Sequence, residues 1–317
     1  MNKHDLSMTL DPETLAFVEQ MEQFPMPPPE GMSIADYRAM TEQFVHAGDP
    51  TPIGSVAEFE IAGPAGPVPV RLYKPEGAGP FPVIVFSHGG GFVLCRFDNH
   101  DELCRELVRE SGLALVAVDY RRSPEVKFPG PLEDVYAAIE WASQQGGEHG
   151  LDPGRIAVCG DSAGGNLAAA VAQVARDRGG PALFHQMLLY PMIDARAVGD
   201  PEHYVRGLFR PSLEWSWQQY LSDDDERDLP HVSPDKAADL AGLAPATMIT
   251  ADLDPLRTEG EAYGWRLVET VPGSVVRRYD GVAHGFLTHT DEGGKAAAAL
   301  RFIGLRLRQA AAAAGGS

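Results

Sequence analysis

The sequence contains few cysteines and no pattern of them that indicates a cross-linked or zinc-bound protein. There are three among 317 residues, Cys95, Cys104 and Cys159, and no two form a C-x-x-C pair. An odd number at these spacings argues against a disulfide framework and against a structural zinc site. A reducing compartment fits this usage, so we expect a cytoplasmic protein.

Positive charge and long apolar segments are also scarce. Lys and Arg total 26 against 45 Asp and Glu, for a net charge of −19. Such a field repels nucleic acid and anionic membranes, so we expect neither as a partner. No segment approaches the ~18 apolar residues of a membrane span, and the first residues lack the apolar stretch of a secretory signal. No H-E-x-x-H or similar cluster is present, so we expect no catalytic metal.

Short apolar runs alternate with helical patterns from residue 55 onward, which predicts a mainly parallel sheet covered on both faces. Two alternating segments, 56–63 and 68–75, indicate an initial hairpin. The later strands are predicted at 81–88, 113–120, 155–160, 186–191, 244–251 and 274–280, and the helices at 101–111, 131–145, 165–178, 261–269 and 295–310.

Two segments interrupt this alternation and are interpreted as a cap. Residues 11–24 and 33–45 each predict a helix, with Asp11 and Ser33 as N-caps and a proline run between them. Residues 198–235 hold an aromatic helix and an acidic loop, which we place over the carboxyl edge of the sheet, where open α/β sheets bind ligands. We therefore divide the chain into N-terminal cap helices (1–50), a first core part (51–197), a cap insertion (198–235) and a second core part (236–317).

The strongest chemical signal is Gly160-Asp161-Ser162-Ala163-Gly164, a G-x-S-x-G between a predicted strand and a predicted helix. This motif is the nucleophile elbow of α/β-hydrolases, in which a sharp turn exposes the serine and glycines make room for it. The alternative interpretation is a glycine-rich turn without chemistry. The strand–helix context favours Ser162 as a nucleophile.

A second motif, His88-Gly89-Gly90-Gly91, follows the predicted strand 81–88. Glycines there let backbone amides approach a substrate, as in the oxyanion hole of the same template. We predict that the amides of Gly90, Gly91 and Ala163 bind the oxyanion. His88 is interpreted as a structural hydrogen-bonding residue and not as a catalyst.

The template places an acid and then a histidine downstream of the serine. His284 follows a predicted strand and is the expected base, with His289 as its rival. The remaining histidines are assigned to surface or cap segments: His4, His46, His100, His149, His185, His203 and His231.

Two carboxylates, Asp252 and Asp254, compete for the acid position after the strand 244–251. We favour Asp254, because Pro255 begins a helix and fixes the loop that presents this side chain. Its role would be to hold the imidazole tautomer and stabilise the imidazolium.

Taken together, these motifs resemble the bacterial branch of the hormone-sensitive-lipase family of carboxylesterases, from about Pro82 to the C-terminal helix. The resemblance implies an eight-stranded α/β-hydrolase sheet with a helical cap, cofactor-free hydrolysis of short- to medium-chain esters through an acyl-enzyme, and Asp254 as the acid. Many members self-associate, so a homodimer is expected. The residues that carry the resemblance are His88-Gly89-Gly90-Gly91-Phe92, Asp119-Tyr120-Arg121, Pro124-Glu125, Phe128-Pro129, Leu132-Glu133-Asp134, Gly160-Asp161-Ser162-Ala163-Gly164-Gly165-Asn166, Tyr190-Pro191, Asp254-Pro255-Leu256 and His284-Gly285-Phe286.

The chain departs from the family pattern at Cys95, Ser123 and Thr258. The departures at Cys95 and Thr258 leave two features unpredicted: the wall of the substrate pocket and the residues that support the acid loop.

The motifs do not distinguish an esterase from other hydrolases of the same chemistry. An amidase, formamidase or lactonase would use the same triad, and some relatives bind ligands without catalysis. The small-molecule pocket is expected among cap residues, although an aromatic cap core is the alternative interpretation. The candidates are Phe24, Met26, Tyr204, Phe209, Trp215 and Trp217.

Overall fold

The computed structural model describes residues 15, 19, 28, 31–43, 48–197, 199, 210–288 and 294–316. Eight strands form one sheet in the order β1-β2-β4-β3-β5-β6-β7-β8. Strand β2 is antiparallel to both of its neighbours, and the pairs from β4 through β8 are parallel. The predicted mainly parallel eight-stranded sheet is confirmed. The strands are β1 (Ser55–Gly63), β2 (Gly66–Lys74), β3 (Phe81–Ser87), β4 (Ala114–Val118), β5 (Leu151–Asp161), β6 (Leu183–Leu189), β7 (Ala246–Leu253) and β8 (Val275–Ala283).

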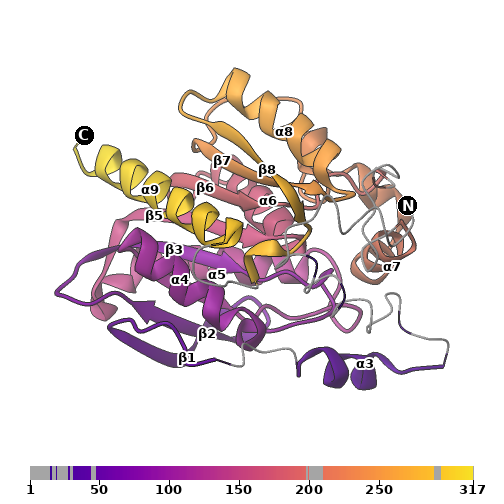
Figure 1. Cartoon of the computed structure of the whole chain (residues 1–317), viewed down its shortest axis with the longest axis horizontal. Coiled ribbons are helices and arrows are strands. Elements are labelled where there is room, and N and C mark those ends of the chain that lie inside the picture. The colour runs from indigo at the N-terminus through magenta and orange to yellow at the C-terminus, as the bar shows by residue number, and fades with distance from the viewer. Residues whose placement is uncertain are drawn as a thin grey trace.

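Helices cover both faces of this sheet (Figure 1). Along β3, Val83 and Val85 pack into one core layer while Ile84 and Phe86 pack into the other, as the two-residue period of a strand requires. Helices α5, α6 and α8 contribute to the first layer, and α4 and α9 to the second. The described helices are α3 (Ile34–Thr41), α4 (Asp101–Ser111), α5 (Gly130–Gln144), α6 (Ala163–Asp177), α7 (Arg210–Tyr220), α8 (Arg257–Thr270) and α9 (Lys295–Gly315), with short 3₁₀ helices η1 (Phe97–His100), η2 (Gly146–His149), η4 (Asp224–Asp228), η5 (Pro234–Lys236) and η6 (Phe286–Thr288).

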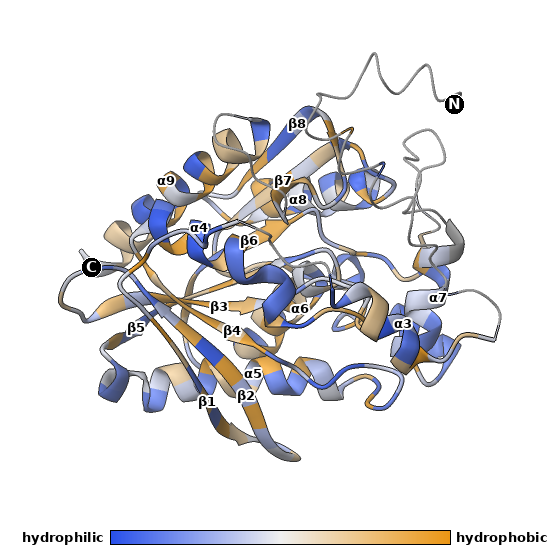
Figure 2. Ribbon diagram, turned by 60° about the horizontal axis from the view of Figure 1, so that its bottom comes forward, coloured by the Kyte–Doolittle hydropathy of each residue, from blue (hydrophilic) through white to orange (hydrophobic). Residues whose placement is uncertain are grey.

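Burial on both faces explains why the central strands are apolar throughout. Every residue of β4 is buried, and the central strands are the most uniformly hydrophobic elements in Figure 2. A parallel strand between two helical layers has no solvent face, so its sequence shows a continuous apolar run.

Helices α3 and α7 lie at the same end of the sheet (Figure 1), and the Tyr37 and Trp215 rings meet edge to face at 6.3 Å. Helix α3 begins after Ser33, whose Oγ accepts a hydrogen bond from the Asp36 amide at 3.0 Å, as the predicted N-cap should. The Arg38 guanidinium donates to the Val93 carbonyl at 2.8 Å. The helix predicted at 11–24 falls outside the described residues.

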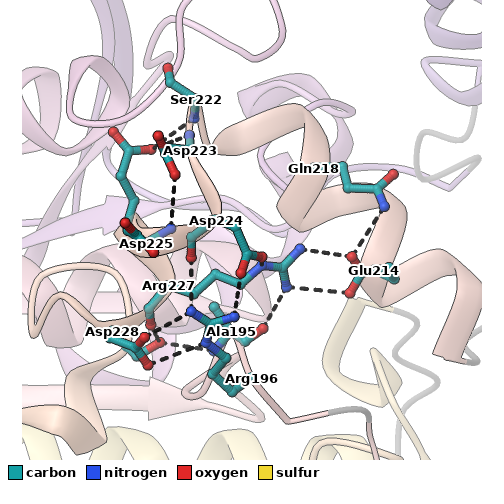
Figure 3. A network of polar contacts seen from close by, with 12 residues as sticks. Ala195, Arg196, Glu214, Gln218, Ser222, Asp223, Asp224, Asp225, Arg227 and Asp228 are labelled. Carbon is teal, nitrogen blue, oxygen red and sulfur yellow. Dashed lines mark hydrogen bonds and ion pairs between the residues drawn. The ribbon is translucent and has the colours of Figure 1, made fainter.

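An arginine network joins α7 to the core (Figure 3). Arg227 of η4 donates to the Ala195 carbonyl, which follows β6, and to Glu214 of α7 at 2.7 Å. Arg196 pairs in turn with Asp224 at 2.5 Å. Because the Arg227 side chain is only 9% exposed, these contacts fix η4 and α7 firmly against the segment that follows β6.

The three cysteines form no disulfide, and Cys104 and Cys159 are buried. Burial raises the pKa of the Cys159 thiol well above its usual range. None of the helices in the described part of the chain is long and apolar enough to cross a membrane.

Candidate active site

Ser162 lies at the tip of the turn between β5 and α6. Its φ of 55° and ψ of −120° are strained for a residue with a Cβ atom, at a cost of about 1–3 kcal/mol. Besides the first hydrogen bond of α6, backbone hydrogen bonds from outside the turn hold it there: the Ser162 amide donates to Leu189 O at 2.9 Å, and the Met192 amide donates to Ser162 O at 3.0 Å. Both partners belong to β6 or the loop after it, so the neighbouring strand supports the strained turn.

Glycines on either side of Ser162 allow a close approach of two backbones. A Cβ atom on Gly164 would overlap the backbone of Ser87 and His88, and one on Gly160 would overlap Gly164 itself. The Ser87 hydroxyl donates to Gly164 O at 2.7 Å. The end of β3 is therefore fixed directly against the first turn of α6.

The structure brings Ser162, His284 and Asp254 into one chain of hydrogen bonds. His284 Nε2 lies 3.0 Å from Ser162 Oγ, and His284 Nδ1 lies 2.8 Å from Asp254 Oδ2. An ionised carboxylate only accepts, so Nδ1 carries the ring proton and Nε2 is free to accept from the serine hydroxyl. Asp254 follows β7 and His284 follows β8, so all three side chains lie at the carboxyl edge of the sheet.

The two aspartates considered for the acid position have different surroundings. Asp254 is 1% exposed, and its second oxygen accepts from the Leu256 amide at 2.9 Å. Asp252 instead accepts from Arg257 at 2.9 Å and from the Gly281 amide at 3.4 Å. Only Asp254 contacts the imidazole.

The loop after β3 has three successive residues with positive φ: Gly90 (109°), Gly91 (61°) and Phe92 (64°). The Phe92 ring stacks on Tyr220 of α7 at 3.9 Å, and a Cβ atom on Gly91 would lie 3.2 Å from Ser216 Cβ. Helix α7 thus packs directly on this loop of Gly89, Gly90 and Gly91, the glycine loop. Facing this loop, α6 begins at Ala163, so its free amides and positive dipole end lie beside Ser162.

Comparisons with known proteins agree with this arrangement. A family model described as the α/β-hydrolase fold matches residues 84–288. The carboxylic ester hydrolase LipN of Mycobacterium tuberculosis is 43% identical over 256 residues, which cover 77% of this chain and 67% of that protein. The chain belongs to the hormone-sensitive-lipase family of α/β-hydrolases.

Solved esterases of similar sequence share the whole fold. A thermostable esterase from Pseudomonas putida aligns with a TM-score of 0.87 at 35% identity, covering 95% of this chain and 97% of that one. A hyperthermophilic esterase from Pyrobaculum calidifontis aligns with a TM-score of 0.86 at 36% identity, covering 95% and 98%. The family membership predicted from the motifs is confirmed.

Two polar side chains far apart in the sequence, Asp161 and His100, meet next to the glycine loop, and no sequence motif predicts this pair. Asp161 accepts from the Gly89 amide at 2.8 Å and faces His100 Nε2 at 3.2 Å. The assignment of His100 to a surface segment is wrong, because the side chain is 4% exposed. Its position just before a helix, in a polar stretch, gives no sign of burial, whereas Asp161 could have been suspected from its place beside Ser162.

His88 is fully enclosed and hydrogen-bonded. Its Nδ1 lies 2.8 Å from Gly89 O, and its ring stacks on Tyr120 at 4.3 Å. Burial, with a smaller effect of His100, lowers the pKa of His88 to about 3, so the ring is neutral. This environment fits the structural role predicted for it.

The remaining predicted site residues are only partly described. Trp217 is 2% exposed and packs on Phe92, whereas Trp215 is partly exposed. His185, also assigned to the surface, is 1% exposed within β6, a second error of the same kind. Among the described residues, no group of three or more His, Cys, Asp or Glu side chains is arranged to hold a metal ion. The predictions for Phe24, Met26, Tyr204, Phe209 and His289, and for His4, His46 and His203, fall outside the described residues.

Proposed function

We propose that this protein is a serine carboxylesterase that hydrolyses short- to medium-chain carboxylic esters, with Ser162 as nucleophile, His284 as base and Asp254 as the residue that orients the base. The observation that carries the proposal is the hydrogen-bond chain from Ser162 Oγ through the imidazole to a buried carboxylate. Relatives named carboxylic ester hydrolase, carboxylesterase and arylesterase support the ester as the substrate class.

In the first half-reaction, Ser162 Oγ attacks the ester carbonyl carbon while His284 Nε2 takes the hydroxyl proton. The carbonyl oxygen becomes an oxyanion, for which we propose the amides of Gly90, Gly91 and Ala163 as donors. One such donor is typically worth ~100- to 1,000-fold in rate. His284 then returns the proton to the alcohol oxygen as the bond to carbon breaks, which leaves the acyl group on Ser162.

In the second half-reaction, water attacks the acyl-enzyme and His284 accepts its proton. The same amides hold the second oxyanion, and His284 returns the proton to Ser162 Oγ as the bond to the acyl carbon breaks, which releases the carboxylic acid and restores the serine hydroxyl. Asp254 stays ionised throughout and stabilises the imidazolium that forms twice in each turnover.

We further propose the division into cap (1–50 and 198–235) and core (51–197 and 236–317). The contacts of α3 and α7 with the glycine loop support a cap over the nucleophile. Trp215, which is partly exposed on α7, and the cap residues Phe24, Met26, Tyr204 and Phe209 are the proposed pocket lining. Trp217, packed behind Phe92, would act through that contact.

The test is hydrolysis of p-nitrophenyl esters of increasing acyl length by the wild type, Ser162→Ala and Ser274→Ala. Ser274 is a matched control, because its buried hydroxyl accepts from the Ala246 amide at 3.0 Å, away from the triad. We expect Ser162→Ala to lose about a million-fold in kcat and Ser274→Ala to keep its activity. Ester hydrolysis that persists in Ser162→Ala would refute the assignment.

Turnover of other substrates by the wild-type protein distinguishes the esterase from the competing hydrolase functions. Matched anilides and lactones should turn over more slowly than the esters. Faster turnover of either would move the assignment to an amidase or a lactonase. A wild type that neither hydrolyses esters nor reacts with a fluorophosphonate would indicate a ligand-binding relative.

Compartment and assembly are separate parts of the proposal. Three free cysteines support the cytoplasm as the compartment. The homodimer expected from the family is tested by light scattering on a size-exclusion column, where a mass of 34.1 kDa would contradict it.

A further inference from the structure

One buried carboxylate joins the two halves of the proposed oxyanion hole. Asp161 directly precedes Ser162 at the elbow, and Gly89 directly precedes Gly90 on the facing loop. The bond from the Gly89 amide to Asp161 Oδ1 is 2.8 Å long, and Asp161 is 4% exposed. The approach is so close that a Cβ atom on Gly89 would lie 2.5 Å from Asp161 Oδ2.

His100 faces the same carboxylate, and its ring lies 5.8 Å from the His88 ring. Its Nε2 is 3.1 Å from Oδ1 and 3.2 Å from Oδ2 of Asp161, and its ring packs 6.0 Å from the Phe86 ring. An ionised carboxylate cannot donate, so Nε2 must be the donor. The pKa directions agree with an ion pair: Asp161 offsets the burial of His100 and raises its pKa, while His100 lowers that of Asp161.

We propose that His100 is a positioning residue of the oxyanion hole, which holds the Asp161 carboxylate against the Gly89 amide and so fixes the peptides of Gly90 and Gly91. This inference rests on the proposed esterase function. His100 touches neither the substrate nor Ser162, and acts only through Asp161.

Two physical reasons connect His100 to the rate. Without the His100 donor, one oxygen of the buried Asp161 carboxylate loses its hydrogen-bond partner, so the carboxylate rotates or releases the Gly89 amide. The oxyanion donors next to Gly89 are then displaced, and a small displacement of a catalytic group costs up to ~100-fold in rate. In addition, an unpaired buried negative charge next to Ser162 would oppose the negative charge that develops on the substrate oxygen. Both effects act on the transition state and not on substrate binding.

The experiment compares His100→Met, His100→Asn and His100→Gln with the wild type and with His185→Gln. The Gln amide reaches the place of Nε2 and keeps a donor there, whereas Asn is one carbon shorter and Met has no donor. His185 is a matched control, because it is equally buried and its Nε2 bonds to Thr247 Oγ1 at 2.9 Å within the sheet.

Three quantities are measured for each variant: kcat and KM on the preferred p-nitrophenyl ester, the melting temperature, and the affinity for two ligands of matched chain length. The first ligand is a trifluoromethyl ketone, to which Ser162 adds so that its oxygen becomes an oxyanion. The second is the corresponding secondary alcohol, which fills the same site without reacting. A residue that only supports the fold would change both affinities together.

For His100→Met and His100→Asn we expect kcat to fall by about 10- to 100-fold with little change in KM, and the ketone affinity to fall by a similar factor while the alcohol affinity is kept. His100→Gln should recover most of the loss, and His185→Gln should match the wild type. If His100→Met fails to fold, the comparison of Asn with Gln carries the test.

Unchanged kcat and ketone affinity in His100→Asn would overturn the inference, as would equal losses of both ligand affinities, or a Gln variant no better than the Asn variant. A wild type that does not hydrolyse esters, or a Ser162→Ala variant that binds the ketone like the wild type, would instead refute the proposed function. The two failures are therefore distinguishable.

Discussion

Gly164→Ala tests how closely the elbow must approach the end of β3. The added Cβ atom would lie 2.5 Å from His88 O and 2.6 Å from the Ser87 carbonyl carbon, where ordinary contacts begin at 3.4 Å. The Ser87 carbonyl oxygen would lie closer still, so the backbones on the two sides must separate by more than 0.9 Å. The turn that carries Ser162 should therefore move by about an ångström or more relative to the glycine loop.

The expected loss is about 100-fold in kcat/KM, since a misplacement of this size typically costs that much. Overpacking of a filled core should also lower the free energy of unfolding by about 1–3 kcal/mol. The assay is steady-state hydrolysis of a p-nitrophenyl ester together with urea unfolding. Gly147→Ala is the control, because a Cβ atom there meets nothing within 4 Å. Wild-type activity and stability in Gly164→Ala would refute the reasoning.

Three further predictions concern the groups around the site. Asp254→Asn should lower kcat by about 10,000-fold, because an amide in place of the carboxylate favours the wrong tautomer of the His284 imidazole. The kcat of Asp252→Asn should stay within ~10-fold of the wild-type value, and equal losses of the two variants in ester assays would contradict this prediction. Burial raises the pKa of Glu259 from 4.5 to about 8, so the folded state holds a proton that the unfolded state releases, and stability should fall as pH rises between these values. In urea unfolding, the Glu259→Gln variant should have the wild-type free energy of unfolding at pH 4.5 and a larger one at pH 9. A variant whose free energy of unfolding falls with pH as steeply as that of the wild type would contradict this prediction. Arg227→Met should cost about 1–3 kcal/mol by leaving a buried carbonyl acceptor unpaired, which unchanged urea unfolding would disprove.

Much of the fold could be predicted because apolar residues recur at different spacings in its core strands and in its helices. The runs 81–88 and 155–160 have no polar face, and in the structure both faces of β3 and β5 are covered. The helix predicted at 101–111 has the bounds of α4. The predicted strand 155–160 is too short: β5 begins at Leu151, and Asp152, Pro153 and Gly154 separate this residue from the apolar run that predicts the strand.

The candidate site also contains residues that the sequence predicts and residues that it does not. Ser162, His284 and Asp254 could be proposed because each sits at a strand end that the topology brings to one edge. The pair of His100 and Asp161 could not, since it depends on a contact between residues 61 apart that no local pattern encodes. Burial of His185 was missed for a related reason, because one polar residue in a strand gives no indication of which neighbours enclose it.

The most direct test of the central claim is to mix the protein with p-nitrophenyl butyrate, quench in acid within the first turnover, and locate the acyl group by peptide mass. The account predicts a butyryl group on the peptide that contains Ser162, formed together with one equivalent of p-nitrophenol, and none in Ser162→Ala. A butyryl group on another residue, or turnover without any acylated peptide, would contradict it.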